Sequence, residues 1–312
     1  MDSAALAQFE AGRGRLASLA YRLLGSAADA EDAVQDTFLR WQAADRERVA
    51  VPEAWLTKVL TNLCLDRLRS AQARHERAAG DWLPEPLLAG DPMLDPADTV
   101  EQRESVSLAV LTLMERLAPV ERAVYVLREA FSYTHAEIAG ILDITESASQ
   151  QHAHRARERV TAERRRGGET DPATARRVVE EFLAAATSGR TERLVALLTD
   201  DVTAVSDGAG LARRLLRYRT PERVASFVRG GFRPTAAKRR LAGGSPSFHI
   251  APVNGSPAVL AVVDGRVVGV VVFGVSDGKV ASLHGIAAAG RLARVAETWR
   301  RHRPDAPAVA TW

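Results

Sequence analysis

The stretch "YTHAEIAGILDITESASQQHAHRARERV", residues 133–160, decides the fold of the N-terminal half of the chain. Thr134 followed three residues later by Glu137 is typical of a capping box, which starts a helix. After the apolar residues of that helix, residues 143–145 predict a turn, in which Thr145 can cap a second helix. Two short helices joined by such a turn form a helix-turn-helix.

The second helix of this motif carries polar side chains that can read base edges and arginines that can hold phosphates. An ordinary helical hairpin with a solvated polar face has the same local pattern, so the motif alone leaves both interpretations open. The candidate DNA-binding residues on this helix are Ser147, Ser149, Gln150, Gln151, His154, Arg155 and Arg157.

Residues 26–42, "SAADAEDAVQDTFLRWQ", predict an earlier helix that has an acidic start and one apolar face. Ser26, three residues before Asp29, is a suitable cap for it. An acidic and apolar surface can dock a basic partner helix, and a solvated surface above ordinary core residues is the alternative. The candidate docking residues are Asp29, Glu31, Asp32, Gln35, Asp36, Phe38, Leu39 and Trp41.

The next predicted helix, "PEAWLTKVLTNLCLDRLRSAQARHE", begins at Pro52, a residue that suits the first turn of a helix. Its apolar residues form a stripe, and polar and basic residues lie largely outside that stripe. Such a surface fits phosphates and bases, although a solvated basic face is equally plausible. The residues concerned are Asn62, Asp66, Arg67, Arg69 and Arg74.

Composition excludes several classes of protein. The formal net charge of the 312 residues is only +3, so the distribution of charge matters more than its total. Cys64 is the only cysteine, which excludes an intrachain disulfide and a multi-cysteine zinc site and suits the cytoplasm. The N-terminus does not resemble a signal peptide, and no apolar run is long enough to span a membrane. We therefore expect a soluble cytoplasmic protein without metal or cofactor and without a membrane partner.

The C-terminal part changes in character. After a helical segment, the dipeptides Asn254-Gly255, Asp264-Gly265 and Asp277-Gly278 each stand between β-rich runs. These dipeptides supply the positive φ angles of tight hairpin turns, so they predict an antiparallel meander of four strands. Helices followed by such a sheet indicate an α+β domain.

Composition also indicates where one domain ends and the next begins. Stretches that contain proline and glycine interrupt the helical segments twice. The predicted division is a helical domain, a linker, a helix-turn-helix domain, an α+β domain and a tail, at residues 1–77, 78–97, 98–166, 171–302 and 303–312.

The order of the helical segments resembles that of a bacterial sigma factor of the extracytoplasmic-function (ECF) group, which retains only regions two and four. The resemblance covers residues 8 to about 163, and four segments match in order. It implies two all-α domains, a region 2 helical bundle and a region 4 helix-turn-helix. It also implies that the chain binds core RNA polymerase, at the β′ clamp and the β flap, and promoter DNA.

The same resemblance assigns roles to the candidate surfaces. The acidic helix at residues 26–42 becomes the polymerase-docking element, and the basic helix that follows becomes the reader of the −10 element. The loop at residues 43–51 would capture a flipped base of the non-template strand. Residues 145–159 become the reader of the −35 element.

The C-terminal domain resembles a SnoaL-like domain of the NTF2-like fold, an α+β cone with an antiparallel sheet. Sigma factors with this extension form a subgroup in which the extension regulates activity in cis, in place of an anti-sigma factor. The subgroup carries a Trp-Leu-Pro-Glu-Pro motif in the linker and a glycine-rich segment in the extension. The matching residues are Trp82, Leu83, Pro84, Glu85, Pro86, Asp207 and Gly208.

The linker motif places apolar residues on a stiffened backbone. Pro84 and Pro86 favour extended conformations, and an exposed tryptophan and leucines are costly unless a neighbour covers them. We expect the SnoaL-like domain to pack on residues 82–86 and so to fix the separation of the two DNA-binding domains. The alternative is that Trp82 folds onto its own helices.

Two other functions remain open at this level. NTF2-like folds include cyclases and isomerases, and His249 and His284 are available on predicted strands, but isolated histidines and fold analogy do not establish catalysis. We therefore expect no enzymatic activity, and a small ligand in the cone is a separate possibility. A one-component regulator, which binds an operator without polymerase, is the third interpretation.

Overall fold

The computed structural model of the chain describes residues 3–73, 83–94, 106–164, 170–211, 214–301 and 306–310. Two of the predicted site residues, Arg74 and Trp82, lie outside these ranges. The chain forms two compact units: Met1–Pro84 with Gly90–Glu163, and Glu85–Ala89 with Arg164–Trp312. A short piece of the predicted linker therefore belongs to the C-terminal unit.

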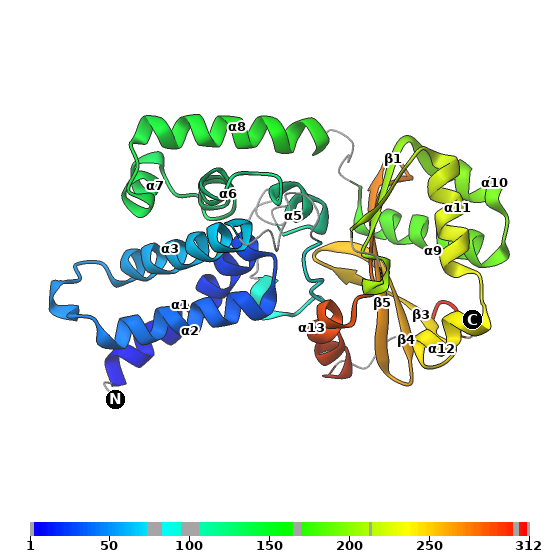
Figure 1. The fold of residues 1–312 in the computed structure, drawn as a ribbon, viewed down its shortest axis with the longest axis horizontal. Coiled ribbons are helices and arrows are strands. Elements are labelled where there is room, and N and C mark those ends of the chain that lie inside the picture. The colour runs from blue at the N-terminus through cyan, green and yellow to red at the C-terminus, as the bar shows by residue number, and fades with distance from the viewer. Residues whose placement is uncertain are drawn as a thin grey trace. The chain divides into compact units, whose positions relative to one another are not determined.

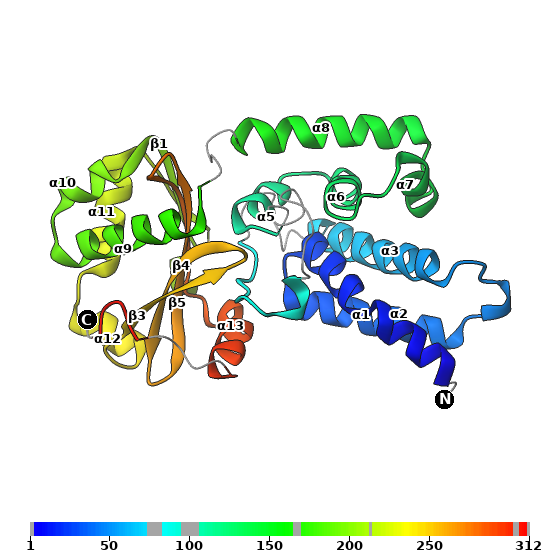
Figure 2. The same cartoon turned by 180° about the vertical axis from the view of Figure 1, so that it is seen from behind.

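The N-terminal unit is helical in the part that the structure describes (Figures 1 and 2). Its first three long helices pack against one another, and the helix-turn-helix follows later in the chain. The elements are α1 (Ser3–Leu24), α2 (Ala27–Ala43), η1 (Arg46–Arg48), α3 (Pro52–Ala73), η2 (Pro92–Leu94), α5 (Leu108–Met114), α6 (Pro119–Tyr125), a π-helix η3 (Val126–Ala130), α7 (His135–Leu142) and α8 (Glu146–Arg164).

The helix starts expected from local signals are confirmed. The hydroxyl of Ser26 accepts a hydrogen bond from the backbone N–H of Asp29 at the start of α2. Thr134 and Glu137 form the capping box of α7. Asp143 ends α7 in the left-handed conformation at φ 54°, and Thr145 Oγ1 accepts from Ala148 N at 3.1 Å to begin α8. The predicted helix-turn-helix is therefore present.

A buried arginine fastens α6 to the end of α1. The Arg122 side chain is 2% exposed, and its Nε and Nη2 donate to the carbonyl oxygen of Arg22 at 3.2 and 3.1 Å. Its Nη1 donates to Glu115 Oε1 at 2.6 Å. The backbone of Arg22 lies in the last turn of α1, where carbonyl groups have no partner within the helix. Arg122 thus satisfies a carbonyl that the helix itself leaves open.

The helix-turn-helix rests on α3. Lys58 Nζ donates to the carbonyl of Gly140 at 2.9 Å and to Asp143 Oδ1 at 2.6 Å. The Thr57 hydroxyl lies 3.2 Å from that of Tyr133, which precedes α7. The first and third long helices, α6 and the helix-turn-helix therefore form one packed unit.

The C-terminal unit combines a six-stranded sheet with helices. The strand order is β2-β1-β6-β5-β4-β3, with β1 parallel to β6 and the other neighbours antiparallel. The elements are α9 (Pro172–Ser188), α10 (Thr191–Ala196), β1 (Leu198–Ser206), η4 (Gly208–Gly210), β2 (Leu216–Arg219), α11 (Pro221–Phe232), α12 (Ala236–Ala242), β3 (Ser247–Val253), β4 (Ser256–Val263), β5 (Arg266–Ser276), β6 (Lys279–Ile286) and α13 (Ala289–Arg301).

The four-strand meander is confirmed, and each of its turns has the expected dipeptide. Asn254, Asp264 and Asp277 have φ values of 50°, 48° and 50°, and the glycine after each is also positive. The sequence did not predict β1 and β2, which add two strands beyond β6. Within β1, residues 200–201 lie at an irregularity, where the pairing with β6 is interrupted between Leu198 and Thr203.

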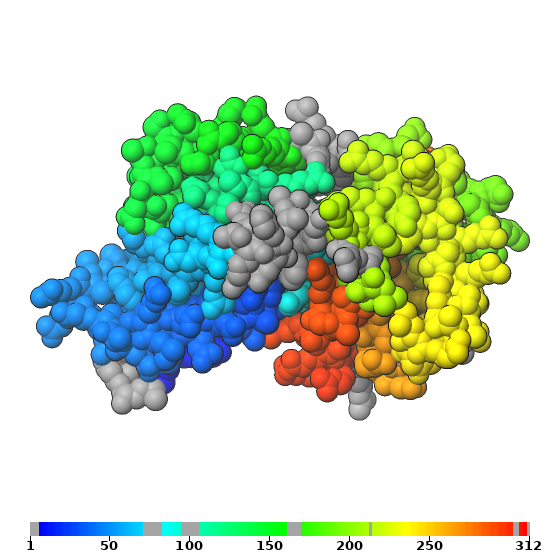
Figure 3. Space-filling model, viewed as in Figure 1, coloured from blue at the N-terminus to red at the C-terminus, as the bar shows by residue number. Residues whose placement is uncertain are grey.

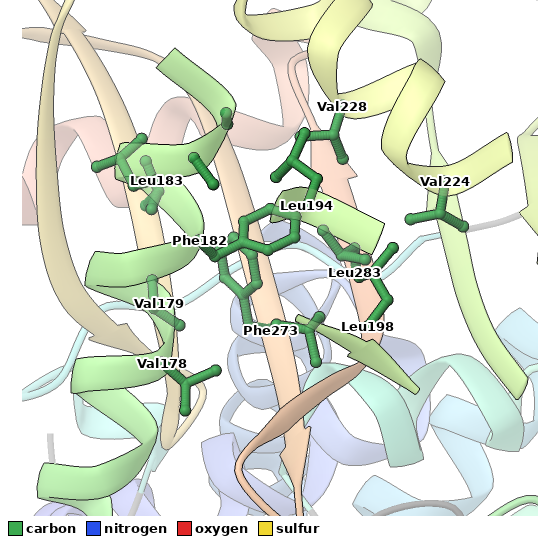
Figure 4. Packing of buried hydrophobic residues seen from close by; sticks show 14 of the residues in the cluster. Val178, Val179, Phe182, Leu183, Leu194, Leu198, Val224, Val228, Phe273 and Leu283 are labelled. Atoms are coloured by element: carbon green, nitrogen blue, oxygen red, sulfur yellow. The ribbon is translucent and has the colours of Figure 1, made fainter. Parts of the chain in front are cut away.

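The two faces of the sheet differ. Phe248, Ile250 and Phe273 belong to the core under α9, α10 and α11, where Phe273 meets Phe182 edge-on at 5.3 Å (Figure 4). Alternate residues point to the other face, where α13 packs against β5. That face carries both strand histidines, His249 and His284, which are 8% and 7% exposed.

Replacing Arg122 by alanine should lower the free energy of unfolding by about 3–5 kcal/mol, because it leaves buried Glu115 without its partner. The measurement is urea unfolding of the full chain followed by circular dichroism. Arg40→Ala, at an exposed position of α2, is the matched control and should unfold like the parent chain. Equal midpoints for the two variants would show that Arg122 does not hold the unit together.

The pH dependence of stability should contain a contribution from His284. Burial, and secondly the charge of Arg217, lower the pKa of this imidazole to about 4. Below about pH 6.5 the unfolded chain therefore binds a proton that the folded protein does not. The contribution is fully present above that pH, and about 3 kcal/mol is lost as the pH falls from about 6.5 to about 4. Urea unfolding of His284→Gln should show a flatter profile over this window, whereas His154→Gln, at an exposed position, should retain the parent slope.

Candidate functional site

One stripe of α8 presents polar side chains to solvent. Ser147, Gln150, Gln151 and His154 are all exposed, and their spacing places them along one face of the helix. The helix lies at the surface of the N-terminal unit (Figure 3). These four of the predicted base-reading residues therefore share one accessible surface, which we call the α8 stripe.

The prediction for Ser149 is wrong. This residue is 0% exposed, and its hydroxyl lies 2.9 Å from Nδ1 of His135, so it ties the start of α8 to α7. Ala153, Ala156 and Val160 continue the same buried side of α8. Their helical spacing from Ser149 was the sequence signal that assigns it to the interior.

The arginines of α8 serve the packing of the unit. Arg155 Nε and Arg159 Nη1 contact the two carboxylate oxygens of Glu121 at 3.0 and 2.6 Å. Arg157 pairs with Glu129 at 2.7 Å. Glu121 is 5% exposed, whereas the side chains of the arginines are about half exposed. Arg155 and Arg157, predicted as phosphate contacts, therefore hold α8 to α6 and η3.

The acidic side of α2 is divided between surface and core. Glu31, Asp32, Gln35 and Leu39 are exposed, and the side chain of Leu39 is notable because a large apolar residue is 54% exposed. We call these four residues the α2 stripe. Asp29 and Asp36 are half-buried.

Two predicted docking residues of α2 pack inward. Trp41 is 1% exposed and its ring lies 5.3 Å from that of Trp55, so its assignment to a docking surface is wrong. Phe38 is half-buried, 4.8 Å from the ring of Phe9. Both belong to the seam between helices because large aromatic side chains are the main source of apolar burial there.

The predicted −10 surface on α3 is also divided. Arg67 donates to Asp36 Oδ2 at 2.7 Å and to the carbonyl of Asp29 at 2.8 Å, so it clamps α3 to α2. Asn62 is half-buried, and Asp66 and Arg69 are exposed. The accessible part of this surface is therefore smaller than the predicted set.

The C-terminal unit holds a segment of the linker as a short extra strand. Leu87 and Asn254 exchange two hydrogen bonds of 2.8 Å, from Leu87 N to the side-chain oxygen of Asn254 and from Asn254 N to the carbonyl of Leu87. Ala89 N donates to Pro252 O at 3.3 Å, and Leu88 forms a bridge with Val253. We call Glu85–Ala89 the linker strand.

The position of the linker strand corrects our expectation in part. We predicted that residues 82–86 are covered, whereas the contacts within the C-terminal unit involve residues 85–89. Leu87 and Leu88 are 0% and 6% exposed, so the apolar linker residues are indeed buried. Leu83 and Pro84 belong to the N-terminal unit, where Pro84 lies beside Gly25.

The glycine-rich segment has an internal role. The carboxylate of Asp207 accepts hydrogen bonds from the backbone N–H groups of Ala209, Ala287 and Ala288 at 3.0 Å each. Gly208, at φ 58°, forms the turn that follows β1. Asp207 thus joins the end of β1 to the connection before α13, a role that the sequence interpretation missed.

The residues that the structure describes form neither a metal-binding cluster nor a membrane-spanning helix. Within those ranges no three or more His, Cys, Asp or Glu side chains group in a way that suits a metal ion. None of the helices in the same ranges is long and apolar enough to cross a membrane.

Two family models match parts of the N-terminal unit. Residues 9–74 match the family model "Sigma-70 region 2", and residues 107–160 match "Sigma-70, region 4". The first match runs from the first turns of α1 through α3, and the second runs from α5 to Val160, near the end of α8.

Curated relatives extend the similarity beyond these regions. The chain is 42% identical over 227 residues to "ECF RNA polymerase sigma factor SigJ" of Mycobacterium tuberculosis, covering 72% of each chain. It is 34% identical over 284 residues to "Probable ECF RNA polymerase sigma factor SigI" of the same species, covering 89% of this chain and 91% of that one. The chain belongs to the ECF RNA polymerase sigma factors. 

The crystal structure of M. tuberculosis SigJ, at 34% identity, matches this sigma factor with a TM-score of 0.70 over 92% of this chain and 98% of that one. The match includes the C-terminal unit, whose helices and curved sheet form the SnoaL-like extension. The sigma factor thus consists of regions 2 and 4, packed in one unit, and a SnoaL-like unit that carries the linker strand.

Replacing Asn254 by glycine should release the linker strand from the SnoaL-like unit. Glycine retains the positive φ of the turn and removes the side-chain acceptor for Leu87 N. A net hydrogen-bond energy of about 1–1.5 kcal/mol predicts roughly tenfold faster hydrogen exchange at Leu87 and Ala89. Asp264→Gly, in the equivalent turn between β4 and β5, is the control. Unchanged exchange in Asn254→Gly would mean that this amide does not hold the linker.

Proposed function

We propose that this sigma factor binds core RNA polymerase, directs it to specific promoters, and is controlled in cis by the capture of its linker on the SnoaL-like unit. The relatives are named as RNA polymerase sigma factors, which supports the first part. The pairing of Glu85–Ala89 with β3 is the observation that carries the second part. In this proposal the chain acts stoichiometrically and makes or breaks no bond.

Polymerase docking is assigned to the α2 stripe. An exposed leucine at the end of an acidic row offers apolar burial together with attraction for a basic partner, the combination that protein interfaces use. Leu39, Glu31 and Asp32 would therefore contact the β′ clamp. Region 4 would contact the β flap, as the resemblance to the family implies.

Promoter recognition is assigned to the α8 stripe for the −35 element. Glutamine can form paired hydrogen bonds with adenine in the major groove, and each good pair supplies about 1–3 kcal/mol of discrimination. Gln150 and Gln151 are therefore the proposed base readers, with Ser147 and His154 beside them. On α3, the exposed Asp66 and Arg69, with Asn62, are the proposed residues near the −10 element.

The packing of the N-terminal unit supports a resting state that must open. Lys58 of α3 binds Gly140 and Asp143 of the helix-turn-helix. These contacts join the helix that carries the proposed −10 residues to the helix-turn-helix that carries the proposed −35 residues. Binding two separate promoter elements requires regions 2 and 4 to part. The packed arrangement is therefore proposed as the form of the free protein.

The linker strand gives the SnoaL-like unit a means of control. The linker must extend when regions 2 and 4 separate, and a residue of extended chain spans at most about 3.3–3.6 Å. Capture of the five residues Glu85–Ala89 by β3 fixes roughly 17 Å of the linker in one position and direction. Release of the strand frees this part of the linker to follow regions 2 and 4 as they separate, so capture favours the resting form.

The assignments of surfaces are tested by promoter-specific transcription in vitro with core polymerase. Leu39→Asp should weaken core binding by about tenfold or more, since burial of a leucine contributes about 1.5–3 kcal/mol. Leu241→Asp, on α12 of the other unit and 63% exposed, is the matched control and should leave core binding unchanged.

Gln151→Ala should reduce selectivity for the preferred −35 sequence and retain core binding. Tight operator binding without any initiation would contradict the sigma-factor proposal.

Control in cis is tested in the same assay. Asn254→Gly should give more transcript than the parent chain at equal, limiting concentration, because the linker is released. Asp264→Gly should behave as the parent chain. Equal activity of all three proteins would contradict control through the linker and leave the sigma activity itself intact.

A further inference from the structure

The SnoaL-like unit contains a pocket of about 500 Å³ at the outer edge of β3. Its walls come from the linker strand, from α9, from α13 and from the chain after α13, and include Leu88, Ala89, Glu180, His249, Trp299 and Val309. The volume lies within the range of small-molecule sites, about 300–1,000 Å³. The pocket lies at the edge of the sheet beside the apolar core, part of which Figure 4 shows, since Leu183 and Ile250 belong both to the pocket lining and to that core.

The backbone of β3 presents a donor and an acceptor to this pocket. Alternate residues of β3 point their N–H and C=O groups away from β4. Phe248 uses both groups to pair with Val309, at 2.9 and 3.3 Å, and the carbonyl of Pro252 accepts from Ala89. Ile250 stands between them and lines the pocket. In the described part of the chain, no hydrogen bond reaches its outward N–H or C=O.

The unpaired stretch of the β3 edge at Ile250 is bounded on both sides by paired residues. The residue pairs at 248 and 252 leave four residue steps of open edge, roughly 14 Å at about 3.4 Å per residue. The linker strand and the chain at Val309 therefore prevent a long strand of another protein from adding to β3. A small molecule with one donor and one acceptor fits the open position, and unpaired backbone groups in a partly apolar site favour such an occupant.

Aromatic side chains define the other preference of the pocket. The rings of Trp299 and His249 meet edge-on at 5.1 Å, and both residues are largely buried, 6% and 8% exposed. His249 Nε2 lies 3.1 Å from the hydroxyl of Ser247. On the side of α9, Arg176 and Glu180 pair at 3.0 Å and are about half exposed. The site thus offers aromatic surface, a backbone donor and acceptor, and charges on its solvent side.

We propose that this pocket binds a small planar ring compound that carries an amide-like pair of hydrogen-bonding groups, with Ile250 as the backbone partner. The linker strand forms one wall, so the ligand binds when the linker is captured and stabilises that state. At a ligand concentration of about 100 times Kd, the ratio of captured to released linker rises about 100-fold. The binding of this ligand does not depend on the proposed function, whereas its effect on regulation rests on the proposed control in cis.

The test uses oxindole, a lactam fused to an aromatic ring, and the full chain labelled with 5-fluorotryptophan. The ¹⁹F resonance of Trp299, assigned with Trp299→Phe, should shift and saturate as oxindole is added. The resonances of Trp41 and Trp55 in the N-terminal unit serve as internal references. N-methyloxindole cannot donate to Ile250 O and should bind about fivefold more weakly, the effect of one hydrogen bond.

A substitution that fills the pocket tests the site directly. Ala184 is an exposed residue of α9 that lines the pocket, so Ala184→Phe should abolish the shift of Trp299. Glu181→Phe, at an exposed position outside the pocket lining, should retain it. Absence of saturation in the parent chain, or equal binding in Ala184→Phe, would overturn the site.

Hydrogen exchange separates this proposal from the proposed function. Saturating oxindole should slow exchange at Leu87 and Ala89 in the full chain, without polymerase or DNA present. Binding without slower exchange would overturn the coupling to the linker. If exchange slows but Asn254→Gly leaves transcription unchanged, the site stands and control in cis fails. If the shift is absent and Asn254→Gly raises transcription, the site fails and control in cis stands.

Discussion

The N-terminal unit depends on one guanidinium that is removed from water. A buried arginine cannot lose its charge, so its donors must find acceptors inside the protein. Arg122 finds them in a carboxylate, Glu115, and in a carbonyl of the last turn of α1, where the helix dipole is negative. Because these partners come from separate parts of the chain, α6 can be buried only when α1 and the end of α5 are in place. The regions on either side of the linker are thereby folded against each other.

The charged residues of region 4 are also paired with partners in the same unit. Its helix α8 is rich in arginine, yet Arg155, Arg157 and Arg159 are directed at Glu121 and Glu129. The side chains left at the surface of the α8 stripe are mostly uncharged. Such a surface has little general attraction for phosphate and depends on the fit of its polar groups to bases. Stability and selectivity are therefore assigned to different faces of one helix.

The sequence predicted those parts of the molecule that short-range signals control. The helix caps at Ser26 and Thr134, the first turn at Pro52 and the hairpins at residues 254, 264 and 277 each depend on residues within a few positions, and they are present. The contacts that place the site join distant residues, such as Leu87 with Asn254 and Arg155 with Glu121, 167 and 34 positions apart. Side-chain type alone also misassigned Ser149 and Trp41, because burial is decided by the neighbouring helix.

The covering of β3 has a consequence for the order of synthesis. An exposed edge strand is a template for aggregation, and β3 lies at the edge of its sheet. The linker strand leaves the ribosome long before β3, so the segment that protects this edge already exists when the strand forms. Val309, which covers the other part, is made afterwards. A SnoaL-like unit without the linker would therefore expose part of the β3 edge and would be prone to aggregate. This gives an advantage to having both segments on one chain.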